Sequence, residues 1–160
     1  MAADPRQEAR RTAGRLVTLT RAGQLDAVTG SLTLLSFAGR RQEQRLRLIL
    51  GALIEALAVM LMRRAHTMGV RGTFGADLRR ADESAVDIDR LAPPVRATVR
   101  ALLAAVNGCP QDADDQVALA LAGGATANVQ VIVLALKWTA NALEWCEDEA
   151  RPDWLDRKAS

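Results

Sequence analysis

Glu55 is the residue whose position most directly suggests chemistry. It interrupts segment 46–62, in which 14 of the 17 residues are Ala, Val, Ile, Leu or Met. An ionised carboxylate among apolar side chains needs water or a cation close by. Glu55 therefore either faces solvent or pairs with an arginine of a neighbouring helix, or it lies at a close helix–helix contact or in a ligand cavity. A single carboxylate does not make an acid–base pair.

Residues with metal-binding or nucleophilic chemistry are few and scattered. Cys109 and Cys146 have no cysteine or histidine neighbour at metal-ligand spacing, and His66 is the single histidine of the chain. Two acidic groups lack the pattern of a calcium loop and are interpreted as solvated surface or helix starts: Asp82, Glu83, Asp87 and Asp89, and Asp112, Asp114 and Asp115. We expect no metal, no cofactor and no enzyme activity, because no nucleophile, base and orienting group are assembled.

Two tryptophans mark a second candidate site. Trp138 and Trp145 are seven residues apart, so a helix aligns them on one face with Val131 and Leu134. We expect this face to be dry, either as core or interface or, together with Glu55, as the wall of a ligand pocket.

Helical patterns cover most of the chain. Ala and Leu are abundant and Tyr is absent, which favours helices over strands. The β-branched run 129–133 is compatible with a strand, but a strand needs partners, so we assign it to a helix. Proline, glycine and apolar periodicity predict helices over residues 5–22, 24–38, 40–68, 94–106, 110–122 and 125–149, with a short acidic helix or turn in 77–91.

These patterns predict an all-α fold, a single-domain bundle of about six to seven helices around a central apolar helix. A chain of 160 residues is long enough to bury a substantial core. We expect residues 1–149 to form the helical domain and residues 150–160, which contain Pro152, to be a flexible C-terminal tail.

The central helix predicts how the chain associates. Segment 46–62 is apolar on nearly every side, so other helices, a second copy of the chain or lipid must cover it. Its most apolar part, residues 48–62, is shorter than the roughly 20 residues that span a bilayer and contains Glu55, which argues against a transmembrane segment. We therefore expect a homodimer with an interface at Gly51, Glu55, Leu57, Ala58 and Met62.

Charge is distributed unevenly along the chain. Residues 1–75 hold 12 arginines against 5 acidic residues, a net +7, whereas residues 76–160 hold 9 basic against 14 acidic residues, a net −5. Folding either preserves this asymmetry or cancels it. If nucleic acid binds, we expect the contact at Arg40, Arg41 and Arg45, although aromatic residues for base stacking and a helix-turn-helix consensus are both lacking.

The composition favours a cytoplasmic, non-enzymatic protein. Residues 1–15 carry charge where a signal peptide would be apolar, and two isolated cysteines fit a reducing compartment. We expect a protein–protein interaction, scaffold or regulatory module that forms a homodimer or binds a protein partner. The alternative is a helical transcriptional regulator that binds DNA or a small apolar ligand.

Overall fold

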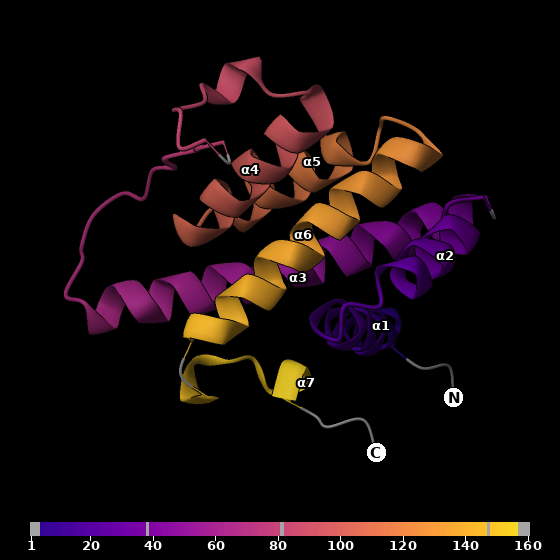
Figure 1. The fold of residues 1–160 in the computed structure, drawn as a ribbon, viewed down its shortest axis with the longest axis horizontal. Coiled ribbons are helices and arrows are strands. Elements are labelled where there is room, and N and C mark those ends of the chain that lie inside the picture. Colours follow the sequence, from indigo (N-terminus) through magenta and orange to yellow (C-terminus); the bar gives the residue numbers. More distant parts are fainter. Residues whose placement is uncertain (1–3, 38, 81, 147, 157–160) are drawn as a thin grey trace.

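The computed structural model describes residues 4–37, 39–80, 82–146 and 148–156, and within these ranges the chain forms seven α-helices and no β-strand (Figure 1). The predicted all-α bundle is therefore confirmed. The helices are α1 (Pro5–Arg21), α2 (Leu25–Ser36), α3 (Arg40–Thr67), α4 (Pro93–Val106), α5 (Pro110–Ala120), α6 (Ala125–Trp145) and α7 (Asp153–Asp156), with two short 3₁₀ helices, η1 (Ile88–Arg90) and η2 (Asp148–Ala150).

Helix α3 lies in the middle of the bundle, and α6 crosses it (Figure 1). Helices α1, α2, α4, α5 and α6 all contact α3, so the chain covers its own most apolar helix. The large side chains that α3 buries all belong to the hydrophobic core: Leu46, Ile49, Leu50, Leu53, Ile54, Leu57 and Met60. No helix in the described ranges is long and apolar enough to cross a membrane.

Within the apolar run of α3, residues 46–62, one narrow stripe stays at the surface. Gly51 and Val59 are half-buried, whereas Glu55 and Met62 are exposed. These residues follow one another at spacings of four, four and three, which places them on a single helix face. The carboxylate of Glu55 therefore faces solvent within the otherwise mostly buried apolar part of α3.

Segment 129–133 is helical and belongs to α6. Val131 and Ile132 are buried because α1, α2, α3 and α4 all pack against α6. The β-branched run thus reflects burial on several sides rather than a strand, since a buried helix tolerates these residues when packing outweighs propensity.

The long connector between α3 and α4, residues 68–92, leads from the end of α3 past α4 (Figure 1) and is fixed to α4 at Phe74 and at η1. The Asn107 side chain accepts from the N–H of Phe74 at 2.8 Å and donates to the carbonyl of Phe74 at 3.1 Å. Further along, Arg79 and Ala85 form a single antiparallel bridge. Of the predicted acidic helix in 77–91, only the short η1 is helical.

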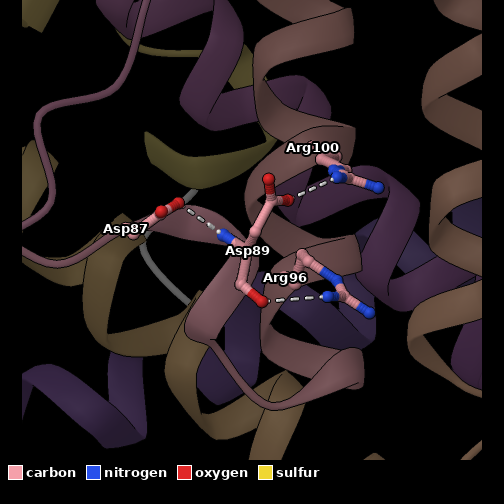
Figure 2. Close-up of polar contacts among 4 residues, drawn as sticks. All are labelled: Asp87, Asp89, Arg96 and Arg100. Carbon is pink, nitrogen blue, oxygen red and sulfur yellow. Dashed lines mark hydrogen bonds and ion pairs between the residues drawn. The ribbon is translucent and has the colours of Figure 1, made fainter.

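A polar cluster fixes the end of this connector to α4 (Figure 2). The Asp87 carboxylate accepts from the N–H of Asp89 at 2.9 Å and so caps η1. Arg96 donates to the carbonyl of Asp89 at 3.1 Å, and Arg100 pairs with the Asp89 carboxylate at 2.9 Å. Because each of the two carboxylates already accepts from a backbone N–H or an arginine, we interpret this cluster as structural: it holds the connector against α4.

The C-terminal segment packs against the bundle, in contrast to the flexible tail expected from residue 150. Ala150, Trp154 and Leu155 lie against the core. Helix α7 contacts α1, and η2 contacts α3. Residues 157–160 of the expected tail lie outside the described residues.

Arg151 supplies the physical reason for this packing. The last carbonyl groups of a helix have no partner within the helix and accept hydrogen bonds from nearby donors. Arg151 donates to the carbonyls of Leu143 at 2.9 Å and Cys146 at 3.3 Å, at the C-terminal end of α6. Arg63 of α3 holds the same segment by donating to the carbonyl of Glu149 at 2.8 Å.

Replacing Arg151 by Gln should lower the free energy of unfolding by about 1 to 3 kcal/mol, because charged hydrogen bonds to buried carbonyls are lost. Urea denaturation followed by circular dichroism measures this loss. Arg90→Gln is the matched control, since the exposed Arg90 side chain makes no hydrogen bond or ion pair within the part of the chain described. Equal stability of the two variants would contradict the role given to Arg151.

Candidate interaction surfaces

The outer face of α2 is the most apolar exposed helix surface. Its members, Ala27, Gly30, Leu34 and Phe37, are spaced by three, four and three residues and are all exposed. Leu34 is 78% exposed and Phe37, at the C-cap, is 74% exposed, the two highest values among large apolar side chains of the described residues. We call these four residues the outer face of α2.

The opposite side of α2 holds the helix in place. Val28 and Leu32 are fully buried and belong to the core, and α2 contacts α1, α3 and α6. Asp26 is the single charged residue between Leu25 and Ser36. A helix that is anchored by one side and carries almost no charge on the other is typical of an interaction surface.

The remaining exposed large apolar residues are spread over α2, α3, α5, α6 and the connector: Leu25, Met62, Met68, Val70, Leu119 and Trp145. Single exposed apolar residues are normal on protein surfaces. Only the outer face of α2 joins two strongly exposed large side chains on adjacent turns of one helix, among the residues that the structure describes.

The three arginines expected to contact nucleic acid line a groove of about 720 Å³ between the start of α1 and the start of α3. Arg45 pairs there with Glu8 at 2.8 Å. Arg40 and Arg41 are exposed and make no ion pair with any described residue. The structure therefore brings the three together, with two of them available to an anion.

Glu55 pairs with Arg10 of α1 at 3.1 Å, and its side chain is 60% exposed. Glu55 therefore both faces solvent and pairs with an arginine of a neighbouring helix, which are two of the alternatives derived from the sequence. An exposed pair of this kind contributes at most about 1 kcal/mol to stability. Glu55 also lines a second groove, which α1 and α3 form with the C-terminal segment.

The expected dimer interface on α3 is divided between core and surface. Leu57 and Ala58 are only 3% and 4% exposed, so a folded chain cannot present them to a partner. They belong to the core because neighbouring helices of the same chain cover them. Gly51, Glu55 and Met62 lie on the solvent stripe of α3, where an interface stays a prediction.

The two tryptophans of α6 have different surroundings. Trp138 is partly buried against the core, whereas Trp145 is 38% exposed and lies under the guanidinium of Arg64, 4.9 Å from its ring centre. The expectation of a uniformly dry face therefore does not hold at Trp145. Neither tryptophan lines the groove of Glu55; the tryptophan that lines it is Trp154.

The aspartates of the connector serve local structure. Asp82 accepts from the N–H and the hydroxyl of Ser84 at 3.0 and 2.6 Å, and these bonds hold the pKa of the Asp82 carboxyl below its ordinary value of 3.8. Within the described part of the chain, no three His, Cys, Asp or Glu side chains gather where a metal could bind.

The charge asymmetry survives folding in part. Helix α1 carries five arginines and one glutamate, whereas the start of α5 carries three aspartates. These helices lie on opposite sides of α3 (Figure 1). Asp153 of α7, which contacts α1, and Asp148 and Glu149 of η2, which contacts α3, reduce the contrast.

No protein-family model, curated protein sequence or solved structure matches this chain. The candidate sites of this chain therefore come from its structure alone: a helical bundle with one apolar outer helix face and two arginine-lined grooves.

Substituting Gly51→Ala should raise the free energy of unfolding by about 0.5 to 1 kcal/mol, because a β-carbon there meets nothing within 4 Å and Ala favours a helix. Gly14→Ala is the comparison, because its β-carbon would lie 3.2 Å from the carbonyl oxygen of Trp154 and should cancel that gain. Urea denaturation measures both. A dimer that dissociates on Gly51→Ala would instead place Gly51 in an interface.

Proposed function

We propose that the protein is an interaction module that self-associates through the outer face of α2. The observation that carries this proposal is the pair Leu34 and Phe37, two large apolar side chains more than 70% exposed on adjacent turns. Covering such side chains gains roughly 1.5 to 3 kcal/mol each when burial is complete. A second copy of the same chain is the occupant that fits this face best.

The shape of the face supports a two-fold pairing. Its first half carries the small residues Ala27 and Gly30, and its second half carries the large residues Leu34 and Phe37. In an antiparallel pair of α2 helices, Leu34 of one copy lies over Gly30 of the other, and Phe37 lies over Ala27. A two-fold interface uses the same patch on both copies, so it requires this kind of self-complementarity.

Charge supports the same arrangement. Asp26 lies near the start of α2, and the exposed Arg40 and Arg41 follow its end, at the start of α3. The antiparallel pairing brings Asp26 of one copy toward these arginines of the second copy, at both ends of the interface. Complementary charges at the rim favour encounter and fix the direction of pairing more than they add affinity.

The size of the face sets the expected strength. A helix of 12 residues is about 18 Å long, so two such helices bury less than a standard interface. We expect a dissociation constant on the order of tens of micromolar, which is typical of a reversible contact. Such a module would bring two copies together in a concentration-dependent way.

The test is sedimentation of the protein over roughly 1 to 500 µM, a range that brackets the expected constant. The natural chain should shift from monomer to dimer. Leu34→Glu should weaken the association at least tenfold, because a charge would be buried without a partner. The substitution should leave the thermal midpoint almost unchanged, because Leu34 is exposed in the single chain.

Leu119→Glu is the matched control. Leu119 is 59% exposed on α5, away from α2, so the same change of chemistry there should leave the dimer intact. A monomer at every concentration would refute the proposal. So would equal weakening by the two variants, because that result would indicate a general effect of charge.

A further inference from the structure

We propose that the groove between α1, α3 and the C-terminal segment binds a small amphipathic anion, a carboxylate, sulfonate or phosphate joined to an apolar body. The groove has a volume of about 750 Å³, within the range of small-molecule sites. It lies on a different part of the molecule from the outer face of α2, and the proposal is independent of self-association.

Arg11 and Arg15 provide the anion-binding side of the groove. They lie one turn apart on the face of α1 that lines it, and both are exposed. Neither makes a hydrogen bond or ion pair through its side chain with any described residue, whereas Arg10 beside them is already paired with Glu55. Two guanidinium groups at this spacing can both donate to a single anionic head group.

Other parts of the lining are suited to an apolar body. Val59 of α3 is half-buried and contributes branched apolar surface, and the half-buried Trp154 of α7 also lines the groove. Trp154 packs against α1 at Gly14, where an added β-carbon would lie 3.2 Å from the backbone oxygen of Trp154. The glycine therefore permits the close approach of Trp154 to α1, beside the groove that both residues line.

The charges of the lining favour a small ligand over a nucleic acid. Five arginines and two carboxylates line the groove, a net +3. The carboxylates of Glu55 and Asp153 would repel a chain of phosphates that followed the groove. A ligand with one anionic head can bind at Arg11 and Arg15 and turn its apolar part toward Val59 and Trp154.

The probe for the test is 8-anilinonaphthalene-1-sulfonate, which combines a sulfonate with an aromatic body and fluoresces when it leaves water. It is titrated into the natural chain and into the double variant Arg11→Gln/Arg15→Gln. We expect saturable binding to the natural chain, weakened at least tenfold in the variant, because charged hydrogen bonds to the head group are lost. Circular dichroism should show unchanged folding, because both side chains are exposed.

Arg6→Gln/Arg21→Gln is the matched control, because it removes the same charge from the same helix outside the groove. The control should change the affinity less than twofold, and Leu34→Glu should leave it unchanged. Equal weakening by both double variants, or loss of binding in Leu34→Glu, would overturn the proposal. A single-stranded oligonucleotide that binds more tightly than the probe and depends on Arg11 and Arg15 would also overturn it, in favour of a nucleic-acid site.

Discussion

The need to bury the apolar side chains of α3 is the constraint on which the rest of the structure depends. Its 28 residues include a long run with apolar side chains on nearly every side, and each large side chain left in water would forgo roughly 1.5 to 3 kcal/mol. The chain meets this demand by itself: five helices contact α3, and within its apolar run only the stripe that contains Glu55 stays open. A second copy is therefore not needed to cover α3, and the self-association that we propose uses another surface, the outer face of α2.

The same constraint accounts for the position of the other features. Helix α2 uses Val28 and Leu32 to cover the α3–α6 pair, which turns Leu34 and Phe37 outward. Helix α1 packs against α3 beside the open stripe, so that Arg10 reaches Glu55, and Arg11 and Arg15 border a groove. The C-terminal segment closes the groove because Arg151 supplies donors to the end of α6. Both proposed surfaces are thus consequences of how the core is closed.

Local patterns were sufficient to predict the helices, and they were not sufficient to predict the surfaces. Prolines at 94 and 110 and apolar periodicity located the helices within about four residues, because helix starts and stops are encoded locally. The partner of Glu55 is 45 residues away, and no spacing rule identifies it. Burial of Leu57 and packing of Trp154 likewise depend on contacts between distant segments. Leu34 and Phe37 lie off the buried stripe of α2, and this pattern could have revealed the outer face from sequence.

Hydrogen–deuterium exchange at protein concentrations well below and well above the midpoint of association tests the central claim most directly. Amides in the middle of α3 should be equally protected at both concentrations, because the single chain buries this helix. Amides of α2 should become more protected at the high concentration, because a second copy covers its outer face. Protection of α3 that appears only at the high concentration, with α2 unchanged, would contradict this account and return the interface to α3.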